Sequence, residues 1–320
     1  MAYRIEHPTI SRIVWWLLGV GFVLLLIQLM RRSSSDAINE QHFNATLDQL
    51  LLPRWLSSVG HDQIAYFLIK ELSTQGFTTT YDEVWNELPY TNVVGIMNPQ
   101  AKQFLLLSCH YDSKYLDTSE EYVSATDGAV SCAILLNMAK KLNYFLHNEF
   151  AHNPDLGLVL VFFDAHDSVD GYVDSTLPLL GSKGFVKAET VSLRQIRLVI
   201  SFNLIGAPDQ IFMSKYQRTY KLHERLADIE QELRTSGKLS DCHQLFHKLK
   251  DHDNDIADDH YAFLEKDIPV MHVVPYTYPE VWLQETDNLQ HLHWPTIRNM
   301  NIIITQFVYE YLNDVAFRTL

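Results

Sequence analysis

The stretch LGLVLVFFDAHD, residues 156–167, decides the fold class. Its first eight residues are an unbroken apolar run rich in β-branched and aromatic side chains, as expected of a strand buried on both faces. Strands that alternate with helices predict an α/β fold with a doubly wound, mainly parallel central sheet flanked by helices. Similar strand-like runs occur at residues 91–97, 104–108, 198–202 and 268–274, and helical patterns occur at residues 65–72, 128–146, 220–233 and 295–312.

The composition indicates one large, acidic domain. The chain has 320 residues, of which 47% are hydrophobic and 12% aromatic, so it can bury a large core. Its 39 acidic residues outnumber 25 basic ones, which gives a formal net charge of −14. A surface of that charge repels a phosphate backbone, so no nucleic-acid partner is expected.

Residues 13–30 form the one segment that is not typical of a globular domain. They carry no charged side chain, and as a helix they would span about 27 Å, close to the hydrocarbon thickness of a bilayer. Trp15 and Trp16 lie near one end, where aromatic rings favour the membrane interface. Arg31 and Arg32 follow in place of a small-residue cleavage site, which favours an uncleaved signal anchor over a cleaved signal peptide with secretion of the remainder.

The predicted organisation has four parts. Residues 1–12 form an N-terminal tail, residues 13–30 a transmembrane signal anchor, the polar residues 31–46 a stem, and residues 47–320 the α/β domain. Asn44 in the stem opens the only sequon for N-glycosylation without proline. Glycosylation there would require the domain to be lumenal or extracellular, whereas the balanced charges that flank the anchor do not fix its orientation.

Polar side chains that can bind metal ions or transfer protons stand where the predicted strands end, at the start of one helix and just before the last strand. In a doubly wound sheet, sites form beyond the carboxyl ends of the strands. One carboxylate in such a position is usually a cap or turn residue, but several such groups predict a functional site at this edge. They are His110, Asp112, Asp127, Asp164, His166, Asp167, Asn203, Asp258, Asp259 and His260.

Six motifs in order along the chain carry a family resemblance. They are CHYDSKY (109–115), SATDGAV (124–130), FFDAHD (162–167), NLIGAP (203–208), DDHYAFL (258–264) and IPVMHVVPYTYPEVW (268–282). With them the sequence resembles the metazoan glutaminyl-peptide cyclotransferases, relatives of the zinc aminopeptidases, and within that family it looks most like the Golgi-resident isoenzyme. The resemblance implies a zinc-aminopeptidase-like fold and a secretory-pathway location, at the Golgi membrane with the domain in the lumen.

The resemblance also implies an activity, which is the conversion of N-terminal Gln or Glu to pyroglutamate. In the family one zinc ion, held by an Asp, a Glu and a His, polarises the side-chain carbonyl of the substrate as a Lewis acid. A neighbouring Glu takes the proton of the attacking amine and returns it to the leaving group. The implied cofactor is therefore zinc. The implied partners are peptide or protein N-termini bearing Gln or Glu, together with a membrane bound through residues 13–30.

Several of the family's metal and proton-transfer positions are changed in this chain. Asp127 matches the zinc Asp, although a helix N-cap is the alternative reading. FFDAHD stands where the family has FFDGEE, which puts His166 at the proton-transfer position and Asp167, one methylene shorter, at the zinc Glu. The third ligand of the family is a His directly after PEVW. That position is Leu283 here, which has no donor atom, and His110 is the candidate substitute for it.

Other pocket positions follow the family more closely. Asp258 matches a buried acid and is, with His166, a candidate catalytic residue, while His272 matches the active-site His. Tyr278 and Trp282 match an aromatic pocket residue and the pocket-wall Trp, although His272 and Trp282 would otherwise read as core residues. Asn203 replaces the Asp of the family's DLIGAP motif, and an amide cannot carry negative charge or relay a proton.

The cysteines bear on the compartment. The residues alone leave a disulfide and two buried free thiols equally open for Cys109 and Cys132, but the resemblance implies that they form the disulfide beside the family's active site. Cys242 is left over and reads as a free thiol or an intermolecular link.

The replaced positions predict a family member with impaired catalysis. General acid–base catalysis contributes a factor of about 10²–10⁴ to the rate. Even the loss of a residue that only hydrogen-bonds to a metal ligand lowers metal affinity about 10–100-fold. The alternatives are an active cyclase with a remodelled metal site and a non-catalytic paralogue that binds peptide N-termini. An aminopeptidase is the least favoured reading, because Asn203 and Leu283 occupy two of its five ligand positions. The remodelled metal site would use His110, Asp127, His166 and Asp167.

Overall fold

The computed structural model describes residues 9–84, 89–119, 121–167, 179–253, 256–315 and 317–319. The chain divides into two units, Met1–Asn44 and Ala45–Leu320. Helix α1 (Thr9–Leu50) makes up the described part of the first unit and ends in the second. Residues 31–46, expected as an irregular stem, are helical as part of α1, and they contain no Gly or Pro that would interrupt a helix.

Within the described residues, no helix is long and apolar enough to cross a membrane. Most side chains of residues 13–30 lie outside the described set, so the anchor predicted there stays a prediction. Asn44 is exposed to solvent, and its glycosylation also stays a prediction.

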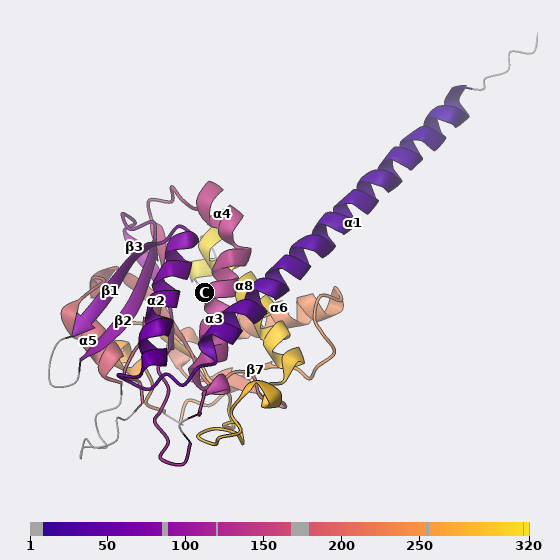
Figure 1. Cartoon of the computed structure of the whole chain (residues 1–320). Helices are drawn as coiled ribbons and strands as arrows, with labels where there is room; N and C mark the ends of the chain where they lie inside the picture. The colour runs from indigo at the N-terminus through magenta and orange to yellow at the C-terminus, as the bar shows by residue number, and fades with distance from the viewer. Residues whose placement is uncertain are drawn as a thin grey trace, which may run out of the picture. The chain divides into compact units, whose positions relative to one another are not determined.

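A mixed sheet of six strands forms the centre of the second unit, and β1, β2 and β3 of this sheet are labelled in Figure 1. The strand order is β1-β2-β4-β3-β5-β8. Strand β3 runs parallel to β4 and β5, and β5 runs parallel to β8, which confirms the predicted mainly parallel sheet. The antiparallel edge made by β1 and β2 was not predicted, because β1 is polar and largely exposed. The strands are β1 (Thr78–Val84), β2 (Tyr90–Met97), β3 (Gln103–His110), β4 (Leu156–Phe163), β5 (Ile196–Phe202) and β8 (Val270–Val273), and a separate pair consists of β6 (Phe212–Ser214) and β7 (Phe246–Lys250).

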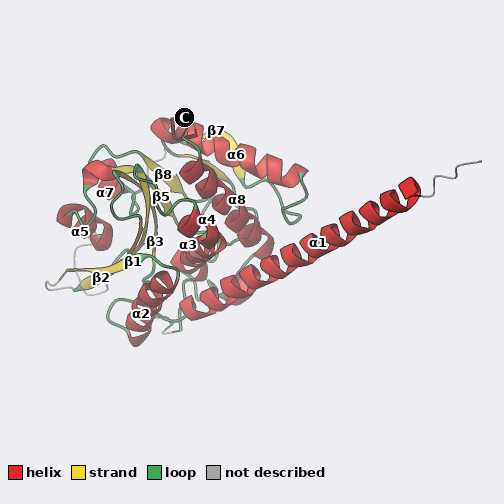
Figure 2. Ribbon diagram, turned by 90° about the horizontal axis from the view of Figure 1, so that it is seen from above, coloured by secondary structure: helices red, strands yellow, loops and turns green. Residues whose placement is uncertain are grey.

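Helices cover both faces of this sheet, as predicted. Helices α5 and α7 lie on one face and α2, α3 and α8 on the other (Figure 2). On the first face the ring of Phe163 in β4 packs against Phe185 of α5 and Phe263 of α7, with ring centroids 5.7 and 6.2 Å apart. The helices are α2 (Val59–Thr74), α3 (Val130–Lys141), α4 (Asn143–Asn148), α5 (Leu180–Ala188), α6 (Tyr220–Thr235), α7 (Tyr261–Leu264) and α8 (Trp294–Asn313). Short helical turns are η1 (Ala125–Ala129), η2 (Leu193–Gln195), η3 (Gln217–Thr219), η4 (Leu289–His291) and η5 (Phe317–Thr319).

The start of the helix predicted at residues 128–146 differs from expectation. A distorted turn, η1, precedes α3, and Asp127 inside it has φ −91° and ψ 78°, outside the helical region. Gly128 follows with φ +100°, and a Cβ there would lie 2.6 Å from the backbone oxygen of His110. Only glycine allows this close approach of η1 to the end of β3. The turn therefore directs Asp127 to the sheet edge, and the N-cap reading of Asp127 is wrong.

Candidate functional site

The predicted convergence of polar residues at the carboxyl edge of the sheet is confirmed. His110 ends β3, the segment 164–167 follows β4, and Asn203 follows β5. Parallel strands end at one edge, so three segments far apart in sequence meet there. The ring of His110 stacks on that of His166, with centroids 3.8 Å apart, and its Nε2 lies 3.2 Å from Oδ1 of Asn203.

Both carboxylate oxygens of Asp127 have partners within the protein. Its Oδ1 lies 3.2 Å from Nε2 of His110, and the indole Nε1 of Trp282 donates to its Oδ2 at 3.2 Å. The side chain is 3% exposed. Asp127 is therefore a buried member of the site, held between the end of β3 and the loop that follows β8.

Two residues that sequence reasoning missed support the segment that carries Asp127. Arg54 is fully buried, and its guanidinium donates to the backbone oxygens of Tyr111, Val123, Ser124 and Asp127. Burial lowers the pKa of Arg54. Asp287 accepts from the backbone N–H groups of Thr126 and Asp127, and burial raises its pKa to about 6. No spacing or motif in the sequence marks either residue.

His166 faces the acids that precede β8. Its Nδ1 lies 3.0 Å from Oδ2 of Asp259 and 3.9 Å from Oδ1 of Asp258. The rings of His166 and His110 are nearly parallel, at 10° to each other. Imidazole nitrogens bind a metal in the ring plane at about 2.0–2.1 Å, so two parallel rings 3.8 Å apart cannot direct both lone pairs at one ion. The structure thus argues against the remodelled metal site in which both histidines are ligands.

Asp167 is one of three carboxylates at this edge, with Asp112 and Asp259, that have a buried oxygen without a hydrogen-bond partner among the described residues. In Asp167 this oxygen is Oδ2. Burial, and then the negative charge of Asp127, raise the pKa of Asp167 to about 7. The backbone N–H groups of His166 and Asp167 donate to Oδ2 of Asp112, at 3.0 and 3.2 Å. The free oxygen of Asp167 is therefore a position suited to a cation or a hydrogen-bond donor.

A second set of contacts centres on Asp258. Its Oδ2 accepts from Nδ2 of Asn203 at 3.3 Å and lies 3.0 Å from Nε2 of His272. Burial raises the pKa of Asp258, but the charge and hydrogen bond of His272 outweigh it and hold that pKa well below its usual range. Asn203, His272 and Asp258 thus form one buried group. The ring of Tyr278 packs edge-on against Trp282, which is 36% exposed.

Leu283 follows Trp282 directly and stands in a constrained backbone conformation. Its φ is +57°, in the left-handed region that non-glycine residues rarely adopt, and its side chain is half-buried. The nearby histidines have other partners. His291 Nδ1 lies 3.0 Å from Oδ1 of Asn288, and His293 Nδ1 lies 2.8 Å from Oγ1 of Thr296. Neither replaces the donor that Leu283 lacks.

The predicted disulfide is confirmed. It joins Cys109 in β3 to Cys132 in α3, next to His110. Cys242 is a half-buried free thiol.

Comparisons with known proteins identify the family. The sequence model of "Peptidase family M28" matches residues 92–308. The glutaminyl-peptide cyclotransferase of Bos taurus is 30% identical to this chain over 315 residues, which are 91% of this chain and 87% of the relative. The chain belongs to the glutaminyl-peptide cyclotransferases of peptidase family M28. The resemblance that the six motifs predicted is therefore confirmed.

Solved structures of the family share this fold. The glutaminyl cyclase of Macrostomum lignano superimposes with a TM-score of 0.77 at 23% identity, covering 87% of this chain and 92% of that one. A Zn-dependent exopeptidase from Parabacteroides distasonis superimposes with a TM-score of 0.69 at 19% identity, covering 85% of this chain and 97% of that one. A zinc-aminopeptidase-like α/β fold, as predicted, is the fold of this cyclotransferase-family chain.

The donors of the site differ from the zinc ligand set that the resemblance implies. A catalytic zinc takes three protein ligands and keeps one position open. Asp127 and Asp167 offer carboxylates, but Leu283 offers nothing. Among the described residues, three groups bring possible ligand atoms within 4.8 Å of one another. Two of them contain Asp258, with His166 and Asp259 or with His260 and His272, and the third consists of His110, Asp112 and Asp167. Oδ2 of Asp112 binds two backbone N–H groups, whereas its Oδ1 has no hydrogen-bond partner among the described residues, so this trio differs from the family's set of an Asp, a Glu and a His but keeps a free carboxylate oxygen.

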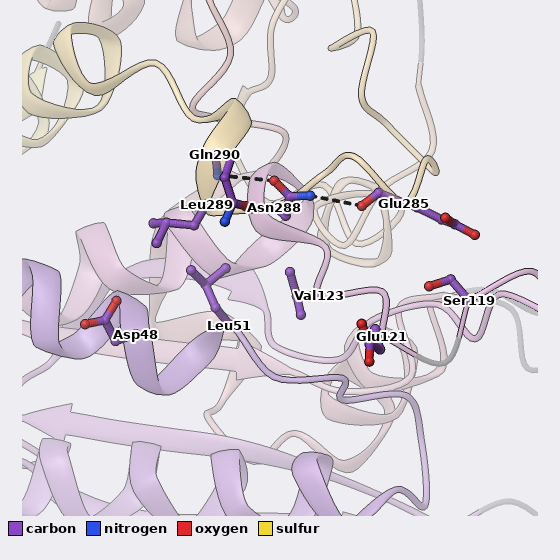
Figure 3. A pocket seen from close by; sticks show the side chains of 9 residues that line it. All are labelled: Asp48, Leu51, Ser119, Glu121, Val123, Glu285, Asn288, Leu289 and Gln290. Atoms are coloured by element: carbon purple, nitrogen blue, oxygen red, sulfur yellow. Dashed lines mark hydrogen bonds between the residues drawn. The ribbon is translucent and has the colours of Figure 1, made fainter.

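A cavity of about 500 Å³ lies beside the chain segments that hold Asp127 in place, which are the residues before η1 and those around Asp287 (Figure 3). Glu121 and Val123 line it just before η1, and Glu285 and Asn288 line it on either side of Asp287. Figure 3 shows Asn288 bonded to both Gln290 and Glu285, which fixes this wall of the cavity.

A buried pair behind the site involves His61 of α2 and Asp164. His61 Nε2 lies 2.8 Å from Oδ1 of Asp164, which also accepts from the backbone N–H of Ala165, and the His61 ring stacks on Tyr111. Burial lowers the pKa of His61, but the hydrogen bond and charge of Asp164 outweigh it and raise that pKa to about 9.

This pair predicts a pH-dependent stability. A histidine whose pKa is raised on folding stabilises fully below its unfolded value of about 6.5, and the effect is lost as pH rises through the folded pKa of about 9. The free energy of unfolding in urea should therefore fall between about pH 6 and about pH 10, and His61→Gln should reduce this fall. If the wild type and the variant lose stability in parallel over that range, the charged pair does not exist.

Proposed function

We propose that this chain is a cyclotransferase-family protein with strongly impaired zinc-dependent cyclisation, and that its pocket still binds peptide N-termini bearing Gln or Glu. The observation that carries the proposal is Leu283, which stands where the resemblance places the family's third zinc ligand and has no donor atom. The engagement of both Asp127 oxygens by His110 and Trp282 supports it. The relatives that share this fold are named as cyclotransferases, glutaminyl cyclases and a Zn-dependent exopeptidase.

The proton-transfer positions support the same proposal. His166 stands where the family has a Glu. Its Nδ1 lies 3.0 Å from Oδ2 of Asp259, and its ring stacks on that of His110. A base acts only when it reaches the proton it removes, within about 2.6–3.2 Å. Asn203 can donate and accept hydrogen bonds but cannot relay a proton from its neighbour Asp258. Metal chemistry and acid–base chemistry are therefore weakened together.

Peptide binding is supported by what the pocket retains. Trp282 and Tyr278 form a partly exposed aromatic wall, and Asp258 with His272 supplies a polar interior. Small-molecule and peptide-end sites combine such apolar walls with a few placed polar groups. The N-terminal ammonium of a peptide carries positive charge and three donors, which suits the unpartnered Oδ2 of Asp167.

Peptide titrations of the full-length chain test the binding. A Gln-initiated peptide should bind, the same peptide with an acetylated N-terminus should bind at least about tenfold more weakly, and Trp282→Ala should weaken binding by a similar factor. His291→Ala, a change at an exposed residue outside the site, is the matched control and should leave the affinity unchanged. Equal affinity for the free and acetylated peptides would contradict a pocket that recognises N-termini.

We further propose that the chain is anchored in a secretory-pathway membrane through residues 13–30, with the α/β domain in the lumen. The Cys109–Cys132 disulfide supports an oxidising compartment, and the exposed Asn44 suits modification there. The Golgi location follows from the resemblance to the Golgi-resident isoenzyme.

Expression in animal cells tests this topology. Treatment with a peptide N-glycosidase should increase the electrophoretic mobility of the wild type and leave Asn44→Gln unchanged. Membrane pellets should retain the chain after carbonate extraction. A wild type that shows no glycosidase shift and stays in the soluble fraction would overturn the proposed location.

A further inference from the structure

A second cavity lies at the edge of the sheet opposite the candidate site. Its lining includes Gln103, the first residue of β3, Ile196, the first residue of β5, and Pro269, which directly precedes β8. The candidate site stands at the other ends of these parallel strands. Since β3 has eight residues, about 25 Å separate the two edges. We call this second space the basal cavity.

The basal cavity gathers positive charge on a chain that is strongly acidic. Five of the chain's 25 Lys and Arg residues line it, against two acids, Glu189 and Asp267, although the net charge of the chain is −14. The lining thus carries a local positive charge, which attracts anions. The five are Arg194, Arg197, Arg218, Lys266 and Arg318.

Most of these cations form no salt bridge with the acids that the structure describes. Within the described part of the chain, Arg218 alone of the five forms a salt bridge, at 2.9 Å to Asp267. Arg197 donates to the side-chain oxygen of Gln103 and to the backbone oxygen of Arg318. Arg318 donates to the backbone oxygens of Tyr311 and Leu312. Neutral acceptors thus hold these two guanidinium groups in place without cancelling their charge.

The charges also act on one another. Burial lowers the pKa of Arg318 and the nearby positive charge of Arg197 lowers it further, while Tyr311 and the negative charges of Asp155 and Asp314 oppose this shift. Two cations fixed side by side repel each other, and an anion between them would remove that cost. The first turn of α6, which contributes Leu222 to the lining, adds the partial positive charge of a helix N-terminus.

The size and walls of the basal cavity define the ligand class. Its volume is about 730 Å³, within the range of small-molecule sites and too small to enclose a folded partner. Guanidinium groups match phosphate oxygens in a planar, bidentate geometry. One phosphate group carries about −1.5 to −2 charges, so the net charge of +3 on the lining, from five cations and two acids, calls for about two such groups. Apolar side chains of Leu198, Ile268 and Tyr311 line the remainder.

We propose that the basal cavity binds a small molecule that carries two or more phosphate groups. Arg197 and Arg318 form its fixed anion-binding floor, and the exposed Arg194 and Lys266 close on the ligand from the rim. This site is independent of the cyclotransferase pocket, because it shares none of its residues.

Calorimetric titration of the full-length chain with inorganic pyrophosphate at low ionic strength tests the proposal. Pyrophosphate should bind saturably below about 1 mM. The double variant Arg194→Gln with Lys266→Gln should bind at least about tenfold more weakly, because each change removes a charge-assisted contact. Lys266→Gln alone should weaken binding in the same direction and serves as the test if the double variant does not fold.

Lys238→Gln is the matched control. Lys238 is exposed and lies beyond the far end of the 16-residue helix α6, about 24 Å from its first turn. The substitution Lys238→Gln removes the same net charge as Lys266→Gln and should leave the affinity for pyrophosphate unchanged. Equal weakening by Lys238→Gln and Lys266→Gln, or no saturable binding in the wild type, would overturn the site. Orthophosphate that binds as tightly as pyrophosphate would overturn the requirement for two phosphate groups.

Discussion

Cyclisation should return when the changed positions are reverted together. The combined variant Leu283→His, His166→Glu, Asp167→Glu and Asn203→Asp should bind about one zinc per chain and form pyroglutamate with a kcat/KM at least about 10²–10⁴ above the wild type. Leu283→His supplies the missing donor, and His166→Glu supplies the proton-transfer carboxylate. Histidine also tolerates a positive φ better than leucine does, so the +57° conformation at position 283 does not oppose the change.

A matched variant separates the metal from the acid–base groups. The triple variant His166→Glu, Asp167→Glu and Asn203→Asp keeps Leu283 and should remain poor in zinc and in activity. Zinc content is measured on the purified full-length chains, and pyroglutamate formation is followed from a Gln-initiated peptide. A folded quadruple variant that binds no zinc would show that the positions are not the family's ligand positions.

Loss of Arg54 should strongly destabilise the domain. Arg54→Met removes one donor from four backbone oxygens, but the oxygen of Asp127 keeps the Ser124 hydroxyl and the contact at Val123 is only part-buried. The buried oxygens of Tyr111 and Ser124 therefore lose most, and an unsatisfied buried acceptor costs about 1–3 kcal/mol. Partial relaxation reduces the total, so the free energy of unfolding in urea should fall by about 3–5 kcal/mol. Arg54→Lys should recover only part of this loss, because one ammonium group cannot reach oxygens of Tyr111, Ser124 and Asp127 at once.

A surface cation provides the control for Arg54. Lys102 pairs with Asp155 at 2.8 Å, but both side chains are largely exposed. Exposed pairs of this kind contribute little, so Lys102→Ala should give an unfolding curve that overlays the wild type. If Arg54→Met unfolds like Lys102→Ala, the buried guanidinium does not organise the segment that carries Asp127.

The sheet and the position of the site were predictable because their signals are local. An unbroken apolar run such as LGLVLVFF identifies a buried strand, and parallel strands place the residues that follow them at one edge. Strand β1 gave no such signal, since an exposed edge strand has few apolar residues. The helical state of residues 31–46 was also missed, because polarity alone does not distinguish a solvated helix from an irregular stem.

The contacts inside the site depend on distances that sequence spacing does not encode. The stacking of His110 on His166 depends on the course of the segment after β4, where the backbone N–H of His166 donates to Asp112, and it argues against a metal site that residue types alone allowed. Arg54 reaches oxygens 57 to 73 positions away, and His61 meets Asp164 103 positions away. No periodicity or motif links such residues, so neither interaction could be derived from the sequence.

Zinc content together with turnover of the full-length wild-type chain tests the central claim most directly. Metal is measured by mass spectrometry after purification with added zinc, and pyroglutamate formation from a Gln-initiated peptide is measured on the same sample. We predict clearly less than one zinc per chain and cyclisation close to the uncatalysed rate. One zinc per chain with turnover of about 1–10³ s⁻¹, as in ordinary enzymes, would contradict the claim of impaired catalysis.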